Sequence, residues 1–350
     1  MMKKKMIAII LVLALLLTLA ACTPTPAQPT PAPATPAPGQ PTPEPTETPA
    51  WTPTRTIEFV VPFSAGGGSD IFARTVVSII NQYNLVDQTI NVVNITGGGG
   101  AIGYADLAQR RGDNYSLGAV GSSFYNAYLV GLSPVNFRDF TVVGALADES
   151  LGVWVRYDSP FQSLREVIEA VRENPGSVIV SSTGGISLGS VAYYLLQHLE
   201  DVEFSYVPFD GGADAVLALL GGHVDITLEN PGTVRAHFEA GTIRPLAIAY
   251  EYRIPGFENT PTFREEGVDI VLSQVRGFIM PPGVPHYVVE FWENIFQQVF
   301  ETPEFQYAYL LDNSLIPLFL NSGDYLIAFE EITAFFLEAF AMMGFDVVDW

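Results

Sequence analysis

Three glycine-rich turns carry the residue types best suited to binding a small anion. The first is VVPFSAGGGSD at Val60–Asp70, and the second, VPFDGG at Val207–Gly212, repeats its beginning. The third, SSTGGIS at Ser181–Ser187, adds hydroxyl groups. Glycine lets backbone N–H groups approach a ligand closely, and a helix that begins at such a turn favours negative charge. None of the turns contains Lys or Arg, so we expect backbone N–H groups, helix N-termini and hydroxyls to bind the ligand.

The sequence signals for a dinucleotide cofactor and for a metal site are weak. The run GGGAIG at Gly98–Gly103 fits the dinucleotide pattern G-x-G-x-x-G. That pattern also needs an acid about 20 residues later, yet no Asp or Glu occurs between Asn114 and Arg138. We therefore expect no dinucleotide cofactor. We also expect no metal site, because the histidines lack the spacing of metal ligands; they are His198, His223, His237 and His286.

A serine hydrolase is the competing catalytic interpretation. The run GISLG at Gly185–Gly189 fits the nucleophile pattern G-x-S-x-G, and Asp225 and His286 follow Ser187 in the chain order of one hydrolase class. In that class the serine stands directly on the turn between strand and helix, whereas here residues 183–186 separate Ser187 from the preceding apolar run. We therefore expect a binding protein and no enzyme.

The turns lie between alternating strand and helix patterns, which predict an α/β fold with mostly parallel sheets. Strands are expected at 56–63, 89–94, 115–120, 177–182, 203–209, 223–230 and 243–250. Helices are expected at about 69–83, 101–110, 124–130, 188–199, 213–220, 233–240, 286–300, 303–311 and 325–343. In open α/β sheets ligands bind beyond the carboxyl ends of the strands, so two halves with matched glycine turns predict a cleft lined from both sides.

The N-terminal region predicts export and a lipid anchor. Residues 1–21 contain a lysine cluster, an apolar run and a small-residue cleavage site, the pattern of a signal peptide. Cys22, the only cysteine, follows Leu-Ala-Ala and resembles the acylated cysteine of bacterial lipoproteins. Residues 22–55 alternate Pro with small polar residues, which predicts a semi-rigid linker. We expect an extracytoplasmic protein held at the cell membrane through Cys22.

The charge excludes nucleic acid as a partner. The chain has 16 Lys and Arg against 38 Asp and Glu, a formal net charge of −22. All three lysines lie in the predicted signal peptide, so the exported chain is still more acidic. Nucleic-acid binding needs a basic surface, which this composition does not supply.

An ordered series of motifs resembles the substrate-binding receptors of tripartite tricarboxylate transporters, also called Bug receptors. It begins with VVPFSAGGGSDIFAR at 60–74 and spans about residues 55–345. The later motifs are GGGGAIG at 97–103, GDNYSL at 112–117, NPG at 174–176, VPFDGG at 207–212, PTFREEG at 261–267 and GFIMPPGVP at 277–285.

The resemblance implies a two-lobed periplasmic-binding-protein fold of type II, with two crossings between the lobes. The crossings would fall near 153–157 and 274–278. Lobe one would then be 56–154 and 276–350, and lobe two 155–275. The receptor would close on a small organic acid or amino-acid-like solute and pass it to membrane transporter subunits. A lipoprotein that senses a solute or scaffolds partners without transport is the alternative.

The resemblance also implies the ligand-binding residues, which lie on the glycine and serine turns. They are Phe63, Ser64, Gly66, Gly67, Asp70, Ser122, Ser123, Ser182, Thr183, Gly184, Ser187, Phe209, Gly211, Gly212 and Asp214. For Asp70 a second role is open, because it also stands in the first turn of its helix with Arg74 four residues later.

Two departures from the family pattern bear on the ligand. Asp210 stands where the family commonly has Lys, and Asn94-Ile95-Thr96 stands where it has Asn-Arg-Pro. Two positive charges are lost, which favours a monocarboxylate or an amino-acid-like solute over a di- or tricarboxylate. Asp210 or Asp214 would then meet an amine.

Overall fold

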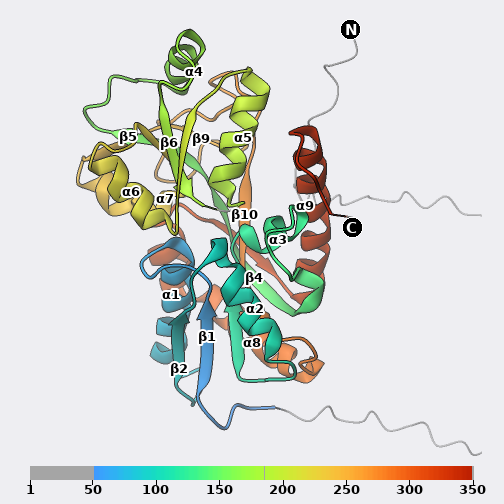
Figure 1. Ribbon diagram of the computed structural model, residues 1–350. Helices are drawn as coiled ribbons and strands as arrows, with labels where there is room; N and C mark the ends of the chain where they lie inside the picture. The colour runs from blue at the N-terminus through green and yellow to red at the C-terminus, as the bar shows by residue number, and fades with distance from the viewer. Residues whose placement is uncertain (1–50, 185, 349–350) are drawn as a thin grey trace, which may run out of the picture. The chain divides into compact units, whose positions relative to one another are not determined.

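The computed structural model describes residues 51–184 and 186–348 (Figure 1). The predicted signal peptide, Cys22 and nearly all of the predicted linker lie outside these residues. The described residues belong to one unit of the chain, Ala50–Trp350, and the following description concerns this unit by itself.

The strands of the described residues form two sheets. Their bounds are β1 Ile57–Val61, β2 Ile90–Asn94, β3 Ser116–Ala119, β4 Thr141–Ser150, β5 Gly152–Arg156, β6 Ile179–Thr183, β7 Ser205–Phe209, β8 Ile226–Glu229, β9 Ile243–Ile248, β10 Ser273–Met280 and β11 Ile316–Leu320. The six-stranded sheet has the order β11-β4-β10-β3-β1-β2, and the five-stranded sheet has the order β7-β6-β8-β5-β9. The predicted α/β class is confirmed.

The expected predominance of parallel pairing is wrong, because both sheets are mixed. Among the described strands, β1 pairs in parallel with β2 and β3, and β6 with β7 and β8. The remaining pairs are antiparallel, and each involves β4, β5 or β10. These three strands flank the points where the chain passes between the sheets. No single strand–helix–strand connection, the link that makes neighbouring strands parallel, joins any of them to a strand that it pairs with. The sequence pattern missed all three.

The chain changes sheet twice. Only Leu151, which is buried, separates β4 in the first sheet from β5 in the second. The return passes through residues 249–272, between β9 and β10. Figure 1 shows β4 and β10 extending side by side toward the second sheet, and they pair over most of their length.

The helices follow the predicted pattern closely. Their bounds are α1 Gly68–Gln82, α2 Ala101–Gln109, α3 Ser123–Leu129, α4 Leu164–Glu173, α5 Leu188–Glu200, α6 Gly212–Leu220, α7 Pro231–Glu239, α8 His286–Glu301 and α9 Ser322–Met342. Helix α4 was not expected, although the Ser163 hydroxyl accepts from Glu166 N as an N-cap. The expected helix at 303–311 is a π-helix, Glu304–Leu310, and short 3₁₀ turns occupy Gly98–Gly100 and Phe137–Asp139.

Large aromatic side chains make the apolar core rigid around the first sheet. Phe278 on β10 stacks on Phe72 of α1 with ring centroids 5.0 Å apart, and on Phe296 of α8 at 4.0 Å. All three rings are at most 1% exposed. This packing fixes the start of α1 relative to β10, and both contribute to the site below. Among the described helices, none is long and apolar enough to cross a membrane.

Candidate functional site

A cavity of about 60 Å³ is lined by residues from both sheets. Its walls come from the turns that follow β1, β3, β6, β7 and β8, at the carboxyl ends of these strands. The N-cap residues of five helices line it, namely Gly67 of α1, Ser122 of α3, Ser187 of α5, Gly211 of α6 and Asn230 of α7. Helix N-termini carry partial positive charge, so this convergence favours a ligand with a negative group.

The turns from the two sheets touch one another at the cavity. Leu188 N, at the start of α5, donates to Ser122 Oγ at 2.8 Å. A Cβ atom at Gly211 would lie 3.1 Å from Ser64 Oγ, so glycine lets the two turns approach this closely without a shift of Ser64. These contacts join the turns of the two sheets at the cavity wall.

In the first turn, Asp70 bonds to its own turn. Its carboxylate accepts hydrogen bonds from Gly66 N, Arg74 Nε and Asn94 Nδ2, each at 2.9 Å. Asn94 Nδ2 also donates to Phe63 O at 2.9 Å. Burial alone would raise the pKa of Asp70, but these hydrogen bonds hold it below 3.8. The predicted pairing with Arg74 is confirmed, and Asp70 does not line the cavity.

The second glycine turn has a carboxylate of the protein at its helix start. Glu229, at the end of β8, lines the cavity and is 5% exposed. A Cβ atom at Gly212 would collide with Glu229 Oε2 and lie 2.8 Å from its Cδ. Thr183 donates to Glu229 Oε1 from its N at 2.8 Å and from its hydroxyl at 3.0 Å. Burial raises the pKa of Glu229 to about 7, and the charge of Glu149 adds to the rise.

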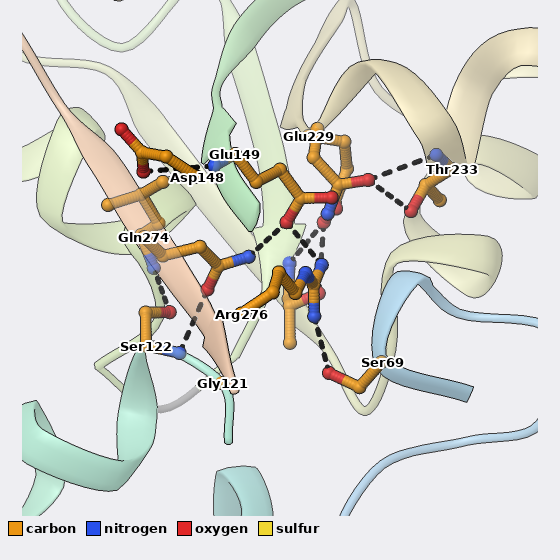
Figure 2. A network of polar contacts seen from close by, with 12 residues as sticks. Ser69, Gly121, Ser122, Asp148, Glu149, Glu229, Thr233, Gln274 and Arg276 are labelled. Carbon is orange, nitrogen blue, oxygen red and sulfur yellow. Dashed lines mark hydrogen bonds and ion pairs between the residues drawn. The ribbon is translucent and has the colours of Figure 1, made fainter. Parts of the chain in front are cut away.

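A buried network on β4 and β10 supplies the cation of the site (Figure 2). Arg276 lines the cavity and is 2% exposed; its Nη2 donates to Glu149 Oε2, and its Nη1 donates to Ser69 Oγ at 2.6 Å. Gln274 Nε2 also donates to Glu149, while Gln274 Oε1 accepts from Ser122 N at 2.9 Å. Figure 2 shows Glu149, Gln274 and Arg276 converging, with Glu229 beside them.

The guanidinium of Arg276 keeps unused donor capacity. A guanidinium has five N–H donors, and Nε of Arg276 is buried without a hydrogen-bond partner among the described residues. The same guanidinium lies against the start of α1, because a Cβ atom at Gly68 would collide with Nη2. A buried, partly unsatisfied cation beside a helix N-terminus can receive a carboxylate.

About half of the predicted binding residues line this cavity. They are Phe63, Ser64, Gly67, Ser122, Thr183, Ser187, Gly211 and Gly212. The others lie elsewhere. Gly66 and Asp70 shape the first turn; Ser123 is buried on α3; Ser182 Oγ contacts Tyr206 OH; Gly184 N donates to Phe209 O. Phe209 and Asp214 line a separate open depression, which Asp210 shares.

Six polar residues that line or support the cavity were not predicted from the sequence. They are Glu149, Glu229, Asn230, Thr233, Gln274 and Arg276. Two signals were available. Arg276 is a single cation in an apolar run, and Glu229 is an acid directly before a helix start, as Asp70 is near the start of α1. The expectation that the ligand site lacks a basic side chain holds for the turns but not for β10.

The competing chemical patterns have structural explanations. Ser187 Oγ donates to Thr183 O at 2.5 Å and accepts from Ser190 N at 3.2 Å as an N-cap. Asp225 accepts from Ile179 N, and His286 pairs with Glu290, so these contacts connect neither residue to Ser187. In GGGAIG, a Cβ atom at Gly103 would lie 2.6 Å from Ile95 O, so this glycine serves close packing of α2.

Known proteins share both the sequence and the fold. The profile of the tripartite tricarboxylate transporter family receptor matches residues 73–332, more than half of the chain. Protein BugT of Bordetella pertussis is 29% identical over 245 residues, which are 68% of this chain and 74% of BugT.

Two solved structures share the fold. One is the Rhodopseudomonas palustris protein Rpa4515 with adipate, with a TM-score of 0.78, 24% identity and coverage of 85% of this chain and 99% of that one. The other is MatC of the same organism with bound malate, with a TM-score of 0.75, 23% identity and coverage of 82% and 99%.

The family consists of extracytoplasmic solute-binding receptors and not of enzymes, which confirms the predicted resemblance and the expected lack of catalysis. The cavity is lined by the N-termini of helices that follow strands of both sheets, and this arrangement suits such a receptor. The chain belongs to the tripartite tricarboxylate transporter receptor family.

Proposed function

We propose that this protein is a lipid-anchored receptor that captures a small organic acid or amino-acid-like solute for a tripartite tricarboxylate-type membrane transporter. The observation that carries the proposal is the cavity itself. Five helix N-termini converge on it, and Arg276 contributes a buried cation with a free Nε. Charge-assisted hydrogen bonds from such groups are worth about 1.5–3 kcal/mol each.

The chemistry of related proteins supports a carboxylate ligand. Malate and adipate, bound by the two R. palustris proteins, are both small carboxylates. In this chain the loss of basic residues at Ile95-Thr96 and Asp210 favours a ligand with less negative charge. Asp210 and Asp214 stand on the open depression, so the acid with access to the cavity is Glu229.

Ligand capture would act through lobe closure. We assign 56–154 and 276–350 to lobe one and 155–275 to lobe two, with crossings near 153–157 and 274–278. The chain changes sheet a few residues earlier, at Leu151 and within 249–272. The hydrogen bond from Leu188 to Ser122 joins the two lobes directly. A ligand that contacts both turns would favour the closed form by its differential affinity, and the closed form would be the one that the transporter recognises.

The N-terminal region would place the receptor at the membrane. Acylation of Cys22 supplies the anchor, and residues 22–55 form a Pro-rich spacer. Mass spectrometry of membrane-extracted protein should find a lipid on Cys22 as the first residue. An unmodified Cys22 or an uncleaved Met1 would contradict the anchor.

A calorimetric titration of the purified full chain tests solute binding. The panel contains malate, adipate, citrate, monocarboxylates and amino acids. We expect at least one compound to bind with a micromolar Kd, and we expect the double variant Glu149→Gln/Arg276→Met to lose at least about tenfold in affinity. Glu169→Gln, an exposed change on α4, is the control and should bind normally. No binding of any panel member would contradict the proposal.

A further inference from the structure

We propose that the ligand is a zwitterion, with its carboxylate held by Arg276 and the start of α1 and its ammonium group held by Glu229. This inference rests on the proposed function as a solute receptor and narrows the class of solute. It assigns binding roles to two side chains that come from different sheets, β10 in the first and β8 in the second.

The carboxylate end is defined by Arg276 and the start of α1. Gly67, the N-cap of α1, has no side-chain cap, so backbone donors of that turn remain available. Arg276 lies against the same turn at Gly68 and has a buried Nε without a partner. Among the described residues that line the cavity, Arg276 is the one basic side chain, so it is the natural partner of a ligand carboxylate.

The ammonium end is defined by Glu229. Its carboxylate lies at the N-terminus of α6, in the position where an unoccupied helix start would attract a ligand anion. Thr183 donates twice to Oε1, and the backbone of Asn230 adds a further hydrogen bond to the carboxylate. An ionised carboxylate has about four acceptor positions, so it can still accept from a ligand, and an ammonium group is the donor that also compensates its charge.

The charges of the cavity argue against a second ligand carboxylate. Glu149 already pairs with Arg276, and Glu229 adds a further acid. A dicarboxylate would bring its second charge toward Glu229, where like charges in a buried site repel strongly. A zwitterion adds no net charge and gives each of its ends an opposite partner.

The pH dependence of affinity separates a zwitterion from an acid. The charged and titratable groups that interact with Glu229 are Glu149 on β4, which pairs with Arg276 on β10, and Tyr206 on β7; Thr183 on β6 donates to its carboxylate. The pKa of Glu229 is raised to about 7 by burial, and an ammonium group needs the ionised form. Zwitterion affinity should therefore rise about tenfold between pH 6 and pH 8. A ligand that accepts a hydrogen bond from protonated Glu229 should instead bind more tightly at pH 6.

Matched ligand pairs provide the experiment. The full chain is titrated at pH 8 with alanine and propionate, aspartate and succinate, leucine and 4-methylpentanoate, and phenylalanine and 3-phenylpropionate. We expect the best amino acid to bind at least about tenfold more tightly than its partner without the amino group. We expect Glu229→Gln to remove most of this ratio and the pH dependence, and Glu169→Gln to keep both.

The outcomes separate the inference from the proposed function. If succinate, malate or another acid without an amino group binds more tightly than every amino acid, the inference is overturned and the receptor function stands. If none of the acids and amino acids binds, both fall. The ligand pairs test the wild-type chain, so the inference remains testable even if Glu229→Gln does not fold.

Discussion

The two glycine turns, Val60–Asp70 and Val207–Gly212, have similar sequences and opposite electrostatic roles. Both follow a Val-Pro-Phe segment, and both start a helix at a glycine. In the first turn the nearby acid, Asp70, bonds to the turn itself, and a cation from β10 lies beside the helix start. In the second turn an acid from β8 lies at the helix start.

The two acids consequently respond to burial in opposite ways. Asp70 accepts from three donors, and its pKa is lowered. The hydrogen bonds to Glu229 oppose only part of the effect of its burial, so its pKa is raised to about 7. The same turn motif can therefore offer a positive site or a titrating acid. Which of these it offers depends on the residues that neighbouring strands bring to it.

Removing Arg276, the cation beside the first turn, should have the largest effect on the free energy of unfolding. Arg276→Met would leave Glu149 buried without its cation, which typically costs about 3–5 kcal/mol in the free energy of unfolding. Adding Glu149→Gln should recover most of the loss, because no unpaired charge remains. Urea denaturation of both variants measures this. A single-variant loss below about 1 kcal/mol would mean that the pair behaves like an exposed one.

The pH dependence of stability should distinguish the two acids. The pKa of Glu229 is higher in the folded state than its ordinary 4.5, so the folded state binds the proton more tightly. The stabilising contribution of Glu229 is then fully present below about pH 4.5. The free energy of unfolding falls by up to about 3 kcal/mol as pH rises through 7. Glu229→Gln should reduce this slope. A smaller slope should remain from Asp148, whose pKa burial raises to about 6.

For Asp70 the expected pH dependence of stability has the opposite sign. Because its folded-state pKa is lowered, it stabilises the fold above its unfolded pKa, and this contribution is lost as pH falls below 3.8. Denaturation curves between pH 3 and pH 8 cover both windows. Identical slopes in wild type and Glu229→Gln would contradict the assigned role of Glu229.

Adding a methyl group at the start of each of the two helices should change the free energy of unfolding by an intermediate amount. Gly212→Ala places Cβ against the Glu229 carboxylate, and we expect overpacking to cost about 1–3 kcal/mol. In Gly67→Ala the new Cβ would meet only Ser64 O at 3.3 Å, and φ is −78°, so the cost should be smaller. Chemical denaturation ranks the two variants, and an equal cost would argue against the close Glu229 contact.

Removing Arg74, the arginine on α1 that pairs with Asp70, should have the smallest effect. Arg74 is 51% exposed, and Asp70 keeps its hydrogen bonds from Gly66 and Asn94 without it. Arg74→Ala should therefore cost at most about 1 kcal/mol. Asp70→Ala, which removes the acceptor of all three donors, is the comparison and should cost more. A larger loss in Arg74→Ala than in Asp70→Ala would reverse this view of the turn.

The sequence predicted the elements that repeat a local pattern. Strands followed by helices and glycine turns were correct at β1–α1, β6–α5 and β7–α6, because apolar periodicity and turn residues are local signals. The strands at the sheet crossings, β4, β5 and β10, were missed as strands. They pair antiparallel with strands that are distant in the chain, and such pairing leaves no local signal.

The sequence by itself determined the family, the α/β class and the turns that surround the cavity, since these depend on residue order and short motifs. Only the tertiary structure decided which charged residues lie at the cavity. Arg276 and Glu149 are 127 positions apart, and Glu229 meets Thr183 across 46 positions. A single charged residue in an apolar strand gives no periodic signal. The register of strands that are far apart in the chain determines which residue it pairs with.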